Sequence, residues 1–140
     1  MQIKGCIPLK INNMSKKTKN IIVTLLLALI AIIFLGSAIG KISGSEQMMK
    51  MATGFGFSEM DFKVLGLIEI VGIALFIFPR TGVLGALLLT AYMGGGIATH
   101  LQHGQTILIP VLIECLIWIT AAIRFPELLV QLTYRTDKAL

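Results

Sequence analysis

The stretch from Ile21 to Gly40 reads IIVTLLLALIAIIFLGSAIG, twenty residues without a charged side chain. At about 1.5 Å of rise per residue, a helix of this length matches a bilayer hydrocarbon core of about 30 Å. It also exceeds the apolar region of about 7–15 residues found in a cleaved signal peptide. We therefore predict that this stretch is a retained transmembrane helix.

The composition of the whole chain also favours a lipid environment. Of the 140 residues, 56% are hydrophobic and 14% are charged, and the mean hydropathy is +0.88. An average soluble domain has about 45–50% apolar and about 25% charged residues. Disordered chains are poor in apolar residues, and two cysteines, Cys6 and Cys115, do not make a disulfide framework. A soluble domain, a disordered chain and a disulfide-stapled module are therefore all disfavoured.

Three further apolar segments follow the first one. Counting all four, their approximate bounds are 21–40, 61–78, 82–100 and 106–123. The predicted fold class is all-α, an integral membrane four-helix bundle over residues 21–125. A basic tail at 1–20 and a second tail at 126–140 flank this bundle, and the true start of the chain is Met1 or Met14.

Local signals mark the ends of these segments. Ser58 and Asp61 have the spacing of a capping box, which predicts a helix start there. Pro79 and Pro126 follow the second and fourth segments as stop signals. The connection 42–60 contains the stretch 45–51, which we interpret as a short interfacial helix, with a simple linker as the alternative.

The distribution of basic residues predicts the orientation. Nine of the twelve Lys and Arg residues lie on the side of the termini: eight in the two tails or in the turn at 79–82, and Arg124 directly after the fourth segment. By the positive-inside rule, both termini are cytoplasmic and the protein is a multi-pass protein of the cytoplasmic membrane. Because five lysines precede the first apolar segment, we interpret the net charge of +5 as a topology signal, and expect no nucleic-acid partner.

Labelling of introduced cysteines tests this orientation. Single cysteines replace Ser45 and Thr136 in a background without Cys6 and Cys115, and intact cells receive a membrane-impermeant thiol reagent. We expect labelling at position 45 and protection at position 136, because the 42–60 connection should face outward. The reverse pattern would contradict the predicted topology.

Two segments carry a similar motif. Leu67-Ile68-Glu69 and Leu112-Ile113-Glu114 are each followed by a Phe-Pro pair, at 78–79 and 125–126. This pattern is compatible with two parallel helical hairpins related by an axis along the membrane normal. Since Leu and Ile are so frequent here, a chance match is the alternative.

Ionisable groups within apolar segments are the candidate functional residues. A carboxylate inside a bilayer costs several kcal/mol unless it is paired, protonated or hydrated, so Glu69 and Glu114 stand out. Helical spacing on the third segment places Tyr92 and His100 on the same side, and Lys41 ends the first segment. We expect one outward-opening polar pocket, formed by Lys41, Glu69, Tyr92, His100 and Glu114.

Three roles for these residues remain open at this point. The glutamates are either packing groups that hold helices together, parts of a proton- or quinone-related site, or metal ligands. Metal binding ranks last, because His100 and His103 form a single pair without further ligands at a recognisable spacing. Glycines on these segments are expected to allow close helix packing, while the triple Gly94–Gly96 is compatible with a hinge or with close approach of a ligand.

The ordered set of motifs resembles the DoxX-like family of small four-helix membrane proteins. The resemblance covers roughly residues 15–125 and rests on GSAIGKI, GLIE, FPRTGVLGALLL and AYMGGGIATH, at 36–42, 66–69, 78–89 and 91–100. It implies a four-helix bundle in a bacterial cytoplasmic membrane. By position, Lys41, Glu69 and His100 match polar residues of the family. Gly96 departs from the pattern, since relatives often have alanine there.

The resemblance also implies a functional context. Relatives include a subunit of an archaeal thiosulfate:quinone oxidoreductase and a mycobacterial protein that gathers thiol- and superoxide-handling partners. We therefore expect an accessory subunit that supports a membrane-associated oxidoreductase or offers a quinone-accessible pocket, without autonomous catalysis, and that forms a homo-oligomer. The alternatives are a small proton-coupled transporter or channel using Glu69 and Glu114, and an independent enzyme with quinone as electron acceptor.

Overall fold

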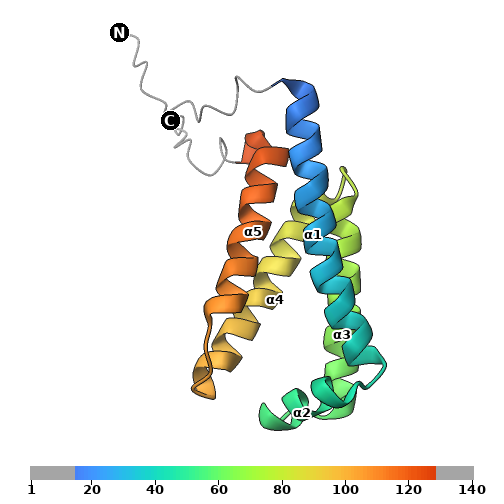
Figure 1. The fold of residues 1–140 in the computed structure, drawn as a ribbon, viewed down its shortest axis with the longest axis vertical. Helices are drawn as coiled ribbons and strands as arrows, with labels where there is room; N and C mark the ends of the chain where they lie inside the picture. Colours follow the sequence, from blue (N-terminus) through green and yellow to red (C-terminus); the bar gives the residue numbers. More distant parts are fainter. Residues whose placement is uncertain (1–14, 129–140) are drawn as a thin grey trace, which may run out of the picture.

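The computed structural model describes residues 15–128, and this part of the chain is helical and contains no strand. Figure 1 shows the long helices running side by side and a short helix at the end away from the start of α1. These helices are α1 (Lys16–Ile42), α2 (Glu46–Gly54), α3 (Glu59–Ile77), α4 (Gly82–Gln102) and α5 (Leu108–Arg124). The predicted tail from 129 onward and both predicted chain starts lie outside the described residues.

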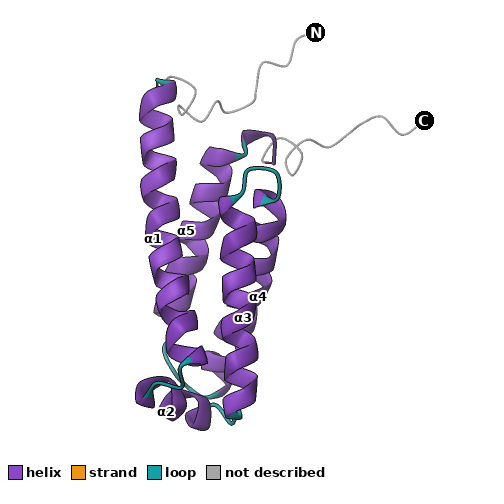
Figure 2. Cartoon of the chain, turned by 90° about the vertical axis from the view of Figure 1, so that its right-hand side faces the viewer, coloured by secondary structure: helices purple, strands orange, loops and turns teal. Residues whose placement is uncertain are grey.

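The four long helices pack in a closed order. α1 contacts α3, α3 contacts α4, α4 contacts α5, and α5 returns to α1. α2 contacts the ends of α1 and α3, and Figure 2 shows it below the long helices. The interior therefore has two ends, one near α2 and one where α1 begins and α5 ends.

The helix starts follow local side-chain chemistry. The Ser15 side chain accepts a hydrogen bond from the Thr18 amide, so α1 begins at Lys16, five residues before the apolar run. The lysines at 16, 17 and 19 therefore extend this helix and do not lie in a separate tail. The capping box of Ser58 and Asp61 is confirmed, because each side chain bonds the other's backbone amide.

Several glycines allow the helices to approach closely. A Cβ added to Gly66 would lie 3.1 Å from the Ala38 carbonyl oxygen, and one on Gly72 would lie 2.6 Å from the Leu89 side chain. A Cβ on Gly85 would overlap the Phe76 backbone. Close packing is thus the role of these three glycines. At Gly94, Gly95 and Gly96 an added Cβ would meet nothing within 4 Å, so this triple has no packing role.

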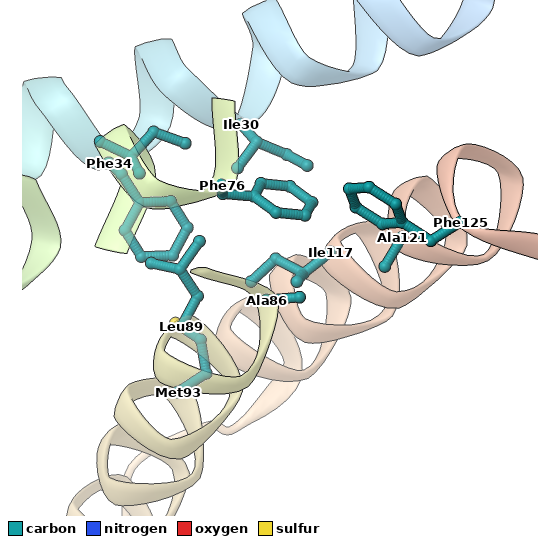
Figure 3. Packing of buried hydrophobic residues seen from close by; sticks show 10 residues of the cluster. Ile30, Phe34, Phe76, Ala86, Leu89, Met93, Ile117, Ala121 and Phe125 are labelled. Atoms are coloured by element: carbon teal, nitrogen blue, oxygen red, sulfur yellow. The ribbon is translucent and has the colours of Figure 1, made fainter. Parts of the chain in front are cut away.

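The apolar core fills the half of the interior away from α2. Figure 3 shows side chains from all four long helices converging there. Its fully buried members include Ile30 of α1, Phe76 of α3, Leu89 of α4 and Ile117 of α5. In lipid, where the hydrophobic effect does not bring helices together, the close van der Waals packing of these side chains holds this half of the interior together.

Arg124 closes this end of the interior. Its guanidinium donates hydrogen bonds to the backbone carbonyls of Phe76 and Ile77, the latter at 2.6 Å. These carbonyls belong to the last turn of α3 and have no partner within the helix. Arg124 therefore satisfies the carboxyl end of α3 from α5.

The outer surface of the helices is apolar. Large apolar side chains are exposed on every long helix, among them Ile32 (71%), Leu67 (57%), Leu101 (60%) and Leu112 (59%). Such a surface is unusual in water, where large exposed apolar patches mark contact sites. Within the described part of the chain, the helices α1 and α4 are long and apolar enough to cross a membrane. Both observations indicate a membrane protein.

A pair of glycine substitutions tests the helix contacts. We expect Gly85→Ala to lower stability by about 1–3 kcal/mol or more, because the new methyl group overlaps the α3 backbone. Gly94→Ala should be neutral or should gain up to about 1 kcal/mol, because it faces open space and favours the helix. Thermal unfolding of the purified protein in detergent measures both. Equal effects of the two substitutions would contradict the packing described here.

Candidate functional site

Four polar side chains from three helices meet at the middle of the interior. The Lys41 ammonium lies 2.6 Å from Glu69 Oε1, so the two residues form an ion pair between α1 and α3. Lys41 also donates to Ser37 Oγ at 2.6 Å and to Tyr92 Oη, on α4, at 3.0 Å. Tyr92 and Ser37 in turn donate to Glu69 Oε1 at 2.5 Å and 3.1 Å. We call Ser37, Lys41, Glu69 and Tyr92 the polar cluster.

Helix geometry positions each member of this cluster. Ser37 and Lys41 lie one turn apart on α1, just beyond the core residue Phe34. Gly66, one turn before Glu69 on α3, allows the α1 backbone to approach. The Phe34 ring packs edgewise against Tyr92, with ring centroids 6.3 Å apart. The polar cluster therefore follows directly on the apolar core.

The polar cluster neutralises its own charge. Lys41 is 6% and Glu69 is 2% exposed, so both have left solvent. Removing two ions from water costs several kcal/mol each, which is recovered only with close pairing and further hydrogen bonds. The hydrogen bonds that Lys41 and Glu69 make with Ser37 and Tyr92 provide this further stabilisation. The ring centroids of Phe62 and Tyr92 also lie 5.8 Å and 5.7 Å from the Lys41 ammonium. Charges at this depth are thus tolerated as a net neutral unit.

One oxygen of the cluster has no partner. Glu69 Oε1 accepts all three hydrogen bonds described above, whereas Oε2 of the same carboxylate is buried and accepts none. A buried acceptor without a donor costs about 1–3 kcal/mol. The site therefore has an unused hydrogen-bonding position.

A cavity of about 510 Å³ lies beside the polar cluster, on the side toward α2. All five helices contribute to its wall, which includes the whole cluster. Its other lining residues are mostly apolar and aromatic, namely Ile33, Phe34, Met51, Phe55, Phe57, Phe62, Leu65, Ala91, Met93, Gly95, Gly96, Thr99, His100, Thr106, Ile109, Pro110 and Ile113. This volume lies within the usual range of small-molecule pockets, about 300–1,000 Å³.

His100 lies at the α2 end of this cavity. Its ring packs against Phe55 with centroids 5.1 Å apart, and His103 contacts the same phenylalanine at 5.3 Å. His100 Nδ1 is buried and has no hydrogen-bond partner. Within residues 15–128, no group of three or more potential metal ligands comes together, so these histidines form no metal cluster there.

Glu114 is the predicted site residue that the structure does not bring to the cavity. Its Oε1 accepts a hydrogen bond from the Trp118 indole at 2.8 Å, one turn further along α5. The cavity wall is formed instead by Pro110 and Ile113. Glu114 follows Pro110 by about one helix turn, but its carboxylate is held by Trp118 of the same helix and does not line the cavity. A single pocket with both glutamates is thus not formed.

Sequence reasoning missed two contributors to the site. Ser37 completes the polar cluster, and its position four residues before Lys41 was the available signal. Phe55, directly after α2, packs against His100, and no sequence pattern linked these two residues.

The fold and this site define a helical membrane protein with a buried ion pair beside an interior cavity. The chain belongs to the DoxX-like family, whose sequence profile matches residues 25–122. The match spans all of the polar cluster together with His100 and Glu114. No curated protein and no solved structure matches this chain.

A double-mutant cycle tests the ion pair. We expect Lys41→Met to cost about 3–5 kcal/mol, because it leaves the Glu69 carboxylate buried without a countercharge. In a Glu69→Gln background the same substitution should cost much less. Thermal unfolding in detergent gives the four stabilities. Simple additivity of the two substitutions would show that the residues are not coupled.

Proposed function

We propose that this chain is an accessory membrane subunit whose cavity binds the polar head of a quinone-class molecule and supports a redox partner. The observation that carries the proposal is the cavity of about 510 Å³ with apolar walls and the polar cluster at one side. Pockets for small molecules combine such walls with a few convergent polar groups.

The chemistry of the wall suits a flat, aromatic head group. Aromatic side chains from three helices and the α2–α3 connection line the cavity, namely Phe34, Phe55, Phe57, Phe62 and Tyr92. Aromatic rings favour stacked or edge-on contacts with another ring. The polar cluster then supplies the hydrogen bonds that orient the head group.

The cavity wall also extends to the outer surface of the helices. Ala91 and Gly95 of α4 and Ile109 of α5 are lining residues and are exposed. Because glycine has no side chain, Gly95 and Gly96 leave this part of α4 uncovered. In a bilayer these positions would face lipid, which would give a lipid-soluble ligand a lateral entry.

The same proposal includes the membrane arrangement. All four long helices would span the cytoplasmic membrane as a bundle, with both termini inside and α2 on the outer face. The charged residues of α3 are compatible with a membrane-spanning helix. Glu69 is neutralised by Lys41, and the other charged residues of α3 lie in its first turns. The proposal also includes association with a membrane-associated oxidoreductase and formation of a homo-oligomer.

The alternative function, a proton-coupled transporter or channel, is less well supported. That function requires Glu69 and Glu114 on one path, but Glu114 bonds to Trp118 and does not line the cavity. Proton movement in liposomes that depends on Glu114 would restore this alternative.

Ligand-induced stabilisation tests the proposed function. Decylubiquinone and its reduced form are titrated, separately, into the purified protein in detergent, and the unfolding temperature is recorded. We expect at least one form to raise it in a saturable way, since a ligand that binds only the folded state stabilises it. Gly96→Leu should abolish the rise, because the new side chain would occupy the cavity.

Gly94→Leu is the matched control. Gly94 lies two residues away on α4, also faces open space and does not line the cavity. Its variant should respond like the unchanged protein. The absence of a response to both forms in the unchanged protein, or a full response in Gly96→Leu, would refute the proposed site.

A further inference from the structure

We propose that the cavity selects the reduced, hydroxyl-bearing form of its ligand over the oxidised form. In this assignment a phenolic hydroxyl of a hydroquinone donates a hydrogen bond to Glu69 Oε2. The inference rests on the proposed function and adds to it the chemical state of the ligand. Its basis is the balance of donors and acceptors in the polar cluster.

Every donor of the cluster is already used. A lysine ammonium has three N–H donors, and those of Lys41 go to Ser37 Oγ, Glu69 Oε1 and Tyr92 Oη. The Tyr92 and Ser37 hydroxyls each have one donor, and both donate to Glu69 Oε1. No proton of these four residues is left for a ligand.

The remaining capacity is that of an acceptor. Glu69 Oε2 is buried, belongs to a residue of the cavity wall and has no hydrogen-bond partner. A carboxylate donates no hydrogen bond when ionised and has about four acceptor sites on its two oxygens, and three donors already meet Oε1. The Lys41 ammonium, 2.6 Å from Oε1, is the countercharge of this carboxylate.

These facts determine which head group fits. A quinone carries carbonyl oxygens, which are acceptors, and would place lone pairs against lone pairs. A hydroquinone carries hydroxyl groups and supplies the missing donor. A cationic amine is also a donor, but the adjacent Lys41 ammonium repels it, and the Lys41–Glu69 pair is already neutral. The site therefore fits a neutral hydroxyl.

His100 does not change this balance. Its unpartnered Nδ1 also lies at the cavity, but His100 is eight residues beyond Tyr92 on α4, roughly 12 Å along the helix axis. The group that meets Glu69 is thus recognised by the polar cluster alone.

Anaerobic binding measurements with both redox forms of decylubiquinone test the inference. In the unchanged full chain in detergent, we expect the reduced form to bind about tenfold tighter or more, since it makes one additional hydrogen bond to a charged acceptor. Glu69→Gln puts an amide with N–H donors in place of the carboxylate, and should reduce or reverse this preference. Glu114→Gln, away from the cavity, should preserve it.

A comparison of ligands on the unchanged protein does not depend on whether a variant folds. The dimethyl ether of the reduced compound has a similar shape but no hydroxyl donor, and we expect it to bind at least about tenfold more weakly than the hydroquinone. Equal binding of the ether, or equal or tighter binding of the quinone, would overturn the selectivity and leave the proposed function in place. Failure of both redox forms to bind would overturn the two together.

Discussion

The structure depends on one constraint: the charged side chains of Lys41 and Glu69 can be buried only as an ion pair. Their contact joins α1 to α3, and Tyr92 adds α4 through hydrogen bonds to both residues. The close approach that this requires explains why Gly66 has no side chain against α1. Three helices are thus placed by the neutralisation of two charges in a medium where an unpaired charge is costly.

The pair also divides the interior into two parts. Away from α2, Phe76, Leu89 and Ile117 are fully buried and belong to one apolar core between the helices. Toward α2, the glycines at 95 and 96 add no side chains, and a cavity remains. The apolar core and the cavity are therefore separated along the helix axes, with the polar cluster between them.

Part of the candidate site could be predicted from the sequence, because an ionisable residue in an apolar segment is conspicuous. Lys41, Glu69, Tyr92 and His100 were found in this way, and all four line the cavity. Glu114 was equally conspicuous, but its carboxylate bonds to Trp118 of the same helix and does not line the cavity. Ser37 was missed, because serine is tolerated at many positions of a membrane helix.

The sequence by itself determined the helical class, the approximate helix ranges and the polar residues inside them. In lipid every backbone group must bond within its own segment, so apolar length and local caps suffice to place helices. Only the tertiary structure decided which polar residues meet, that Gly94–Gly96 faces open space, and that Glu69 Oε2 keeps a free position. These features depend on the rotation and spacing of packed helices, which follow from side-chain contacts between segments distant in the chain.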